Sequence, residues 1–376
     1  MHIAVVSHIR HPIRPPFFSV QESHAWYLVR ALRAAGHDVT HFASGDSDHD
    51  PVPIVGIHYD QEFPWHDRHG TRALADHLDT AFATTARDLR DGDFDVIHNT
   101  SLHHYLPRLA RAERLPMLTS LYRPPAEPLR QAILDGAAPW SQVTVPTQTQ
   151  AQIWWPKGPA PQNHVVPTGI DPADWPFRGG GNGSAIWAGQ IAPEMGTHFA
   201  VTAAQFAGLP LTIFGRIERQ DYFDRMVRPY LGKAIRYGGP VQGAELASQM
   251  GQASVFLFTP LGDAPSGRAA IEAMATGLPV AAVDNGPVRE IIGDAAGCFA
   301  PPNEPAALGM AMKRAMQIDP AIPRRRVEDH FTVERMVADY VTLYAQARDG
   351  LSHDMPAADF GTADLRIASQ ERLAAE

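Results

Sequence analysis

The chain of 376 residues has only one cysteine, Cys298, so it cannot form an internal disulfide. Such scarcity is typical of a protein in a reducing compartment. No apolar run approaches the roughly 18–20 residues that a membrane-spanning helix needs. The amino terminus, MHIAVVSHIRHP, has a short apolar run and lacks the basic region of a signal peptide. We therefore expect a soluble, cytoplasmic protein with no integral membrane segment.

The chain also has fewer positively than negatively charged residues. The chain has 32 Lys and Arg against 41 Asp and Glu, a net charge of −9, which gives no general affinity for nucleic acid. With 44% hydrophobic and 19% charged residues and no internal repeat, the composition excludes wholesale disorder, collagen and coiled coil. Because single cores stop growing at roughly 250–300 residues, we expect more than one domain.

Short strand patterns alternate with helical stretches through the first half of the chain. Ile3–Ser7 (IAVVS) is β-branched and bounded by polar residues, which indicates a buried parallel strand. A helical spacing of apolar residues follows, Gly36 ends it, and Val39–Ala43 supplies the next strand. Further strands are expected at Phe94–His98, Pro116–Leu121, Gln142–Pro146 and Asn163–Val166. This alternation predicts a doubly wound α/β domain, Rossmann-like, over residues 1–170.

Residues 171–184 (DPADWPFRGGGNGS) hold two prolines and four glycines without a helix or strand pattern, so we expect an interdomain linker. The alternation restarts in residues 185–332 and predicts a second Rossmann-like domain. Its strands are expected at Ala185–Ala188, Leu211–Phe214, Ile235–Tyr237, Val255–Phe258 and Val280–Val283. An amphipathic helix over 333–348 is expected to pack back on the first domain, before a polar tail, 349–376. The active site is expected in the cleft between the two domains.

The strongest chemical pattern is SGRAAIEAMATGLPVAAVDNGPVREII, which begins at Ser266. Ser266 and Gly267 open a predicted helix, whose unpaired amides and dipole suit a phosphate. Arg268 adds a bidentate donor for phosphate oxygens, and Glu272, one turn further, is placed for a ribose hydroxyl. An ordinary capped helix with a surface arginine and glutamate is the alternative.

Two loops that follow predicted strands are weaker candidates. WAGQIAPEMGTH, from Trp187 to His198, is a strand, a loop and a helix start, and such loops line clefts in these sheets. A plain connector has the same pattern. The loop after the first strand carries His8, Arg10 and His11, which either receive an anion or are simply solvated.

Histidines follow two successive strands of the first half. His98 ends one expected strand and His103 and His104 follow it, and Tyr122 and Arg123 follow the next strand. Histidine pairs serve as acid–base groups or metal ligands, but no carboxylate or cysteine lies at ligand spacing nearby, so we expect no metal site. Packed or solvent-facing histidines are the alternative interpretation.

The motifs, in combination and order, resemble the retaining family 4 glycosyltransferases of the GT-B fold. They include HIAVVSH, GHDVTHFASGDS, FDVIHNTSLHH and VPTGID in the first half, and GQIAPEMGTHFAV, FGRIERQDYF, IRYGGPV and GCFAPPNEPAAL in the second. The resemblance covers about residues 1–348, and its nearest branch contains oligosaccharide-antibiotic transferases of actinomycetes. It implies sugar transfer from a nucleoside diphosphate donor to a small-molecule or glycan acceptor, with retention, without a metal and without a resident cofactor.

The sequence departs from that family where the donor is held. The family's glycine pair in the first-strand loop falls on Ser19–Val20, with Glu22 after it matching, and its reacting-centre histidine falls on Tyr122. The arginine and lysine that bind the diphosphate fall on Gln190 and Met195. Losing one such donor in a closed site typically costs about 2.7–4 kcal/mol.

The two family glutamates, which bind the donor sugar and the ribose, fall on Ala264 and Glu272. Arg268, Arg123 and Asp263 are the expected compensating groups, with Arg10 and Arg14 beside the altered loop. The expected donor-binding residues are Gln190, Met195, Arg236, Ser266, Gly267, Arg268 and Glu272. The expected substrate-binding residues are Ser19, Glu22, His98, His103, Arg123 and Asp263, with Tyr122 and Arg268 as catalytic residues.

Three hypotheses follow from the resemblance and its losses. The first is an active glycosyltransferase with a non-standard donor pocket. The second is an inactive pseudoglycosyltransferase that acts as a partner subunit of a true glycosyltransferase; a homodimer is a further arrangement. The third keeps the fold and changes the chemistry, a reading with only fold analogy behind it.

Overall fold

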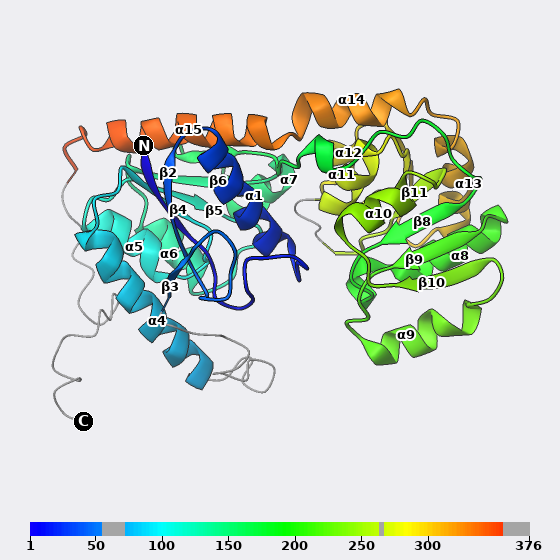
Figure 1. The fold of residues 1–376 in the computed structure, drawn as a ribbon, viewed down its shortest axis with the longest axis horizontal. Helices are drawn as coiled ribbons and strands as arrows, with labels where there is room; N and C mark the ends of the chain where they lie inside the picture. Colours follow the sequence, from blue (N-terminus) through cyan, green and yellow to red (C-terminus); the bar gives the residue numbers. More distant parts are fainter. Residues whose placement is uncertain (55–71, 263–266, 356–376) are drawn as a thin grey trace. The chain divides into compact units, whose positions relative to one another are not determined.

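The computed structural model describes residues 1–54, 72–262 and 267–355 (Figure 1). The chain divides into two compact units. Unit 1 comprises Met1–Pro146, Ala151–Val166 and Met336–Glu376, and unit 2 comprises Thr147–Gln150 and Pro167–Arg335. Each unit is described below by itself.

Unit 1 is built on a seven-stranded, fully parallel sheet with the strand order β3-β2-β1-β4-β5-β6-β7. The strands are β1 (His2–Val6), β2 (Asp38–Ala43), β3 (Val52–Pro53), β4 (Val96–Asn99), β5 (Met117–Ser120), β6 (Ser141–Val145) and β7 (Asn163–Val165). The order reverses direction at β1 and β4, as in a doubly wound Rossmann-like sheet, and the carboxyl ends of all strands meet at one edge. Residues in the loops after β1, β4 and β5 therefore gather there.

The helices that cover the unit 1 sheet come from both ends of the chain. They are α1 (Val20–Ala34), α4 (Arg72–Asp91), α5 (Tyr105–Ala112), α6 (Leu129–Asp135), α7 (Gln148–Trp154) and α15 (Val333–Gly350), the last helix among the described residues. Tyr340 and Tyr344 of α15 are completely buried. The Nδ1 atom of His98, on β4, lies 2.6 Å from the Tyr344 hydroxyl, so α15 packs on the unit 1 sheet.

Unit 2 is a six-stranded, fully parallel sheet with the order β10-β9-β8-β11-β12-β13. Its strands are β8 (Ala185–Ala188), β9 (Leu211–Phe214), β10 (Ile235–Gly239), β11 (Val255–Phe258), β12 (Val280–Val283) and β13 (Gly297–Ala300). Its helices are α8 (Thr197–Ala207), α9 (Gln220–Met226), α10 (Gly243–Met250), α11 (Arg268–Ala275), α12 (Val288–Ile292), α13 (Pro305–Ala315) and α14 (Ala321–His330). The predicted pair of doubly wound α/β domains is confirmed.

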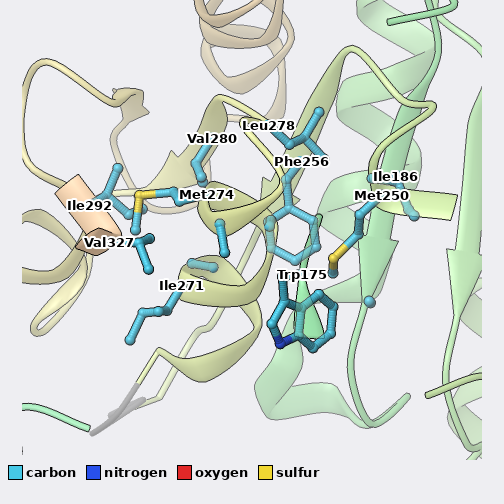
Figure 2. Packing of buried hydrophobic residues seen from close by; sticks show 14 of the residues in the cluster. Trp175, Ile186, Met250, Phe256, Ile271, Met274, Leu278, Val280, Ile292 and Val327 are labelled. Atoms are coloured by element: carbon cyan, nitrogen blue, oxygen red, sulfur yellow. The ribbon is translucent and has the colours of Figure 1, made fainter. Parts of the chain in front are cut away.

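The apolar residues of α11 hold that helix against the unit 2 sheet. Figure 2 shows Ile271 and Met274 of α11 packed in one cluster with Phe256 of β11, and all three are completely buried. Burial of a side chain of this size contributes roughly 1.5–3 kcal/mol. The first turn of α11, which carries the strongest chemical pattern of the sequence, is therefore fixed on a rigid core.

The expected linker is more ordered than its composition indicates. A short 3₁₀ helix, Pro172–Asp174, begins where the Asp171 carboxylate accepts a hydrogen bond from the Ala173 amide at 2.9 Å. Trp175 is 3% exposed and belongs to the apolar core of unit 2. The interpretation of 171–184 as a stretch without helix was wrong there, because Asp171 caps the short helix and Pro172 stands at its first position, where proline is favoured.

Candidate functional site

The start of α11 carries a largely buried ion pair. Arg268 donates from Nε to Oε1 of Glu272 at 2.7 Å, and the two side chains are only 10% and 13% exposed. Burial raises the pKa of the Glu272 carboxyl, and the charge of Arg268 and its hydrogen bond act against that rise. Gly267, before the helix, has φ +53°, and a Cβ there would lie 2.5 Å from Cδ1 of Ile291, so the position favours glycine. Ser266, Asp263 and the substituted Ala264 lie outside the described residues.

The loops after β8 and β11 are tied together at the carboxyl edge of the unit 2 sheet. Trp187 donates from Nε1 to the Thr259 hydroxyl at 2.9 Å, which donates to the carbonyl of Met195 at 3.0 Å. The Leu261 amide donates to the Glu194 carbonyl at 2.8 Å. These bonds bring the loop with Gln190 and Met195 to the loop that leads into α11.

The two substituted cation positions differ in their surroundings. Gln190 is exposed, whereas Met195 is partly buried and packs against the apolar core around α8. The Met195 side chain therefore contributes packing where the resemblance leads us to expect a charged contact.

Arg236 is not brought to this edge. It is the second residue of β10, an edge strand, and it is exposed. Three strand spacings, about 14 Å, separate β10 from β11. Because Arg236 lies near the amino end of its strand, we leave it out of the candidate donor site.

Ser19 and Glu22 form a capping box at the start of α1. The Ser19 hydroxyl accepts from the Gln21 amide at 3.2 Å, and the Glu22 carboxylate accepts from the Ser19 amide and lies 3.0 Å from Nε2 of His8. Burial alone would raise the pKa of Glu22, but the bonds to His8 and Ser19 and the nearby positive charges outweigh it and lower the pKa to about 2. Both side chains thus stabilise the helix start.

Tyr122 is turned into a buried cluster of unit 1. Its hydroxyl lies 2.7 Å from Nδ1 of His24 and 3.2 Å from the hydroxyl of Tyr340. The next residue, Arg123, lies near other charges: partial burial and the positive charge of Arg10 lower its pKa, and Glu22 acts in the opposite direction. Of the two residues after β5, Tyr122 is buried among other side chains, and Arg123 is the exposed one.

His98 is a core residue. Its Nε2 lies 2.8 Å from the Ser120 hydroxyl, its Nδ1 is bound to Tyr344, and burial lowers its pKa to about 3. With no exposed surface, the ring faces other side chains instead of a substrate. We leave His98 out of the candidate site.

His103 and His104 have a carboxylate beside them, contrary to expectation. Asp79 of α4 places Oδ1 3.2 Å from Nε2 of His103 and 3.8 Å from Nε2 of His104. The premise that no carboxylate lies near these histidines was wrong, because the partner is 24 residues upstream and is brought in by the packing of α4 on α5.

Unit 2 also contains a cavity of about 310 Å³. Its lining includes Ser254 and Pro279, which immediately precede β11 and β12, and the glycines of 179–181. It therefore lies at the amino edge of the sheet, opposite the loops that carry Gln190 and Arg268.

Within residues 1–54, 72–262 and 267–355, no helix has both the length and the apolar composition that crossing a membrane requires.

Comparison with solved structures supports the fold. The chain is similar to a glycosyltransferase involved in avilamycin A biosynthesis (18% identical, TM-score 0.69, 93% of this chain and 98% of that one). It is similar to sucrose-phosphate synthase from Thermosynechococcus elongatus (20%, TM-score 0.70, 92% and 98%). It is also similar to Anabaena HepE in complex with UDP and glucose (16%, TM-score 0.69, 92% and 99%).

Curated relatives are similar over part or most of the chain. Glycogen synthase of Mycobacterium tuberculosis is 28% identical over 187 residues, which span 47% of this chain but only 44% of that protein. Phosphatidyl-myo-inositol mannosyltransferase of Mycobacterium leprae is 24% identical over 79% of this chain and 84% of its own length.

Family models match both halves. Residues 21–174 match Glycosyltransferase Family 4, and residues 181–329 match Glycosyl transferases group 1. The chain therefore belongs to the glycosyltransferases of the GT-B fold, with a family 4 domain followed by a group 1 domain.

Proposed function

We propose that the protein transfers a sugar from a nucleoside diphosphate sugar to a small-molecule or oligosaccharide acceptor, with retention and without a metal at the reacting centre. The observation that carries the proposal is the largely buried Arg268–Glu272 pair at the amino end of α11, within the group 1 domain. HepE, which has the same fold, binds UDP and UDP-glucose. A UDP-sugar is therefore the first donor to test.

In the proposed reaction, the bond between the sugar C1 and the leaving diphosphate oxygen breaks, and a bond from C1 to the acceptor oxygen forms on the same face. The acceptor proton passes to an oxygen of the departing diphosphate. Amides at the start of α11 and the Arg268 guanidinium stabilise the charge that develops there. Glu272 orients Arg268, to which it is hydrogen-bonded, and accepts a hydrogen bond from the ribose in this proposal.

Thermal unfolding with a panel of nucleoside mono- and diphosphates and their sugars tests the donor. A ligand at about 100 times its Kd stabilises the folded state by about 2.7 kcal/mol, which raises the unfolding midpoint measurably. We expect a rise with one nucleotide family, with UDP first, and larger for diphosphates than for monophosphates. A cooperatively folded sample that shifts with none of them contradicts the proposal.

The second candidate is an inactive partner subunit, and the packed Met195 and exposed Gln190 favour it, because neither side chain carries a positive charge. The variant Gln190→Arg/Met195→Lys separates the two candidates. For the active protein we expect UDP affinity to rise by roughly tenfold per restored cation, since a hydrogen bond to a charged group is worth about 1.5–3 kcal/mol.

Calorimetric titration with UDP and UMP measures this effect, with Gln205→Arg, at an exposed position of α8, as the matched control. Binding by the variant but none by the unmodified chain assigns the protein to the inactive class. Equal UDP affinity in both proteins shows that these two loop positions do not face the diphosphate.

A further inference from the structure

Three ligand-bearing side chains meet in unit 1, outside the candidate donor site. Asp79 comes from the second turn of α4, and His103 and His104 come from the loop between β4 and α5. One ligand atom from each, a carboxylate oxygen and two ring nitrogens, can be chosen so that all three lie within 4.8 Å of one another.

The surroundings hold this group in place and leave it reachable. The His103 ring is stacked on Phe82, one turn after Asp79, with ring centroids 4.3 Å apart and planes 15° apart. Its side chain is 7% exposed, whereas the Asp79 and His104 side chains are 31% and 20% exposed. Entry from solvent on the side of Asp79 and His104 is therefore open to a small ion.

The two separations from Asp79 are close to those of ligands around one small transition-metal ion. Bond lengths of 2.0–2.1 Å in a tetrahedral zinc site place neighbouring ligand atoms roughly 3.3 Å apart. Here Oδ1 of Asp79 lies 3.2 Å from Nε2 of His103 and 3.8 Å from Nε2 of His104. We propose that Asp79, His103 and His104 bind one divalent transition-metal ion, with Zn²⁺ the best match, and that water takes the fourth position.

The choice of metal follows from the donor set. Two imidazoles and one carboxylate suit Zn²⁺ and its neighbours in the first transition row, whereas Mg²⁺ and Ca²⁺ take oxygen ligands. Because the ligands come from α4 and from the start of α5, a bound ion would tie these two helices together. The site therefore stabilises unit 1 and is independent of the proposed sugar transfer.

In the metal-free state His103 forms hydrogen bonds that a metal ion would have to replace, and their loss lowers the affinity for the ion. The Tyr105 amide donates to Nδ1 of His103 at 3.3 Å, so Nε2 of the neutral ring carries the proton and donates it to Asp79. On metal binding at Nε2 the ring proton moves to Nδ1, and the long contact from the Tyr105 amide opens. This cost predicts an exchangeable ion, which a chelator removes while the protein stays folded.

The test uses the full chain without a polyhistidine tag, stripped with EDTA and titrated with ZnCl₂ in a calorimeter. We expect one Zn²⁺ per chain and a raised unfolding midpoint, with no effect from MgCl₂. Asp79→Asn and His104→Gln, both partly exposed, are each expected to weaken Zn²⁺ binding at least tenfold. Tetrahedral Co²⁺ absorption, present in the unmodified chain and lost in both variants, gives a second readout.

His330→Gln, at an exposed position of α14, is the matched control, because the chain has 18 histidines that give background binding. Comparing the Zn²⁺ and EDTA midpoints within each protein removes any effect of the substitution on folding itself. No Zn²⁺-dependent rise in the unmodified chain, or the same rise in Asp79→Asn/His104→Gln, overturns the proposal. Nucleotide binding is measured separately, so either proposal can fail alone.

Discussion

An Arg268→Ala variant is expected to lose roughly 100- to 1000-fold in kcat/KM, because one donor to a developing oxyanion in a closed site is typically worth that much. The lost binding energy should concern the diphosphate part of the donor. In calorimetric titrations we expect Arg268→Ala to lose affinity for UDP and to keep its affinity for uridine. Glu272→Gln, at the proposed ribose contact, is expected to weaken both ligands.

The Arg268→Ala substitution also breaks the ion pair with Glu272, so its effect on stability has to be separated from its effect on UDP binding. Removing Arg268 leaves Glu272 buried without its cation, which raises the pKa of Glu272 further, so the carboxyl takes up a proton. Unfolding midpoints of both variants separate lost stability from lost binding. Arg289→Ala is the matched control, since Arg289 is an exposed arginine of α12 paired with Asp284 and Asp294. Full UDP affinity in Arg268→Ala would remove Arg268 from the donor site.

The second large effect expected is acid destabilisation of unit 1 through two buried histidines. Burial, chiefly, lowers the pKa of His41 and of His98 to about 3, from an ordinary value of 6.5. Between these values the unfolded chain binds protons that the folded chain excludes. The free energy of unfolding therefore falls as pH drops below 6.5, by up to about 1.4 kcal/mol per pH unit for each histidine.

The variant His98→Gln tests whether His98 contributes to the loss of stability at acid pH. We expect it to be less stable at pH 7, because Tyr344 and Ser120 lose their bonds to the ring, but to show a shallower loss of stability between pH 6.5 and 4. Urea unfolding at several pH values measures the slope, and His330→Gln serves as the control with an unchanged slope. Hydrogen exchange should place the acid-sensitive opening in β4 and α15. A slope identical to that of the unmodified chain rules out His98 as its source.

Local patterns predicted the sheets closely. Ala185–Ala188, Leu211–Phe214, Val255–Phe258 and Val280–Val283 are strands with the expected bounds, because each is a short apolar run between polar or glycine-containing turns. Rossmann-like alternation then fixes their parallel direction. The two-residue β3 and the strand Gly297–Ala300 were missed, since neither has a distinctive apolar run.

Side-chain roles were predicted less well, because they depend on contacts distant in sequence. Tyr122 meets Tyr340 across 218 residues, and His98 meets Tyr344 across 246. No spacing rule links such pairs. The capping box of Ser19 and Glu22 was the exception: Ser-x-x-Glu before an apolar helix is a local signal that could have assigned both residues to the helix start.

The contacts of Tyr340 and Tyr344 also determine the order in which the protein can fold as it leaves the ribosome. Domains made during synthesis usually fold in the order in which they emerge, amino-terminal first. The strands β4 and β5 of unit 1 cannot complete their core until α15 has been synthesised, because Tyr340 and Tyr344 of α15 pack in that core. By then every residue of unit 2, which ends at Arg335, has already been synthesised. The second unit is thus complete first, and translation has to reach α15 before the first unit can close its core.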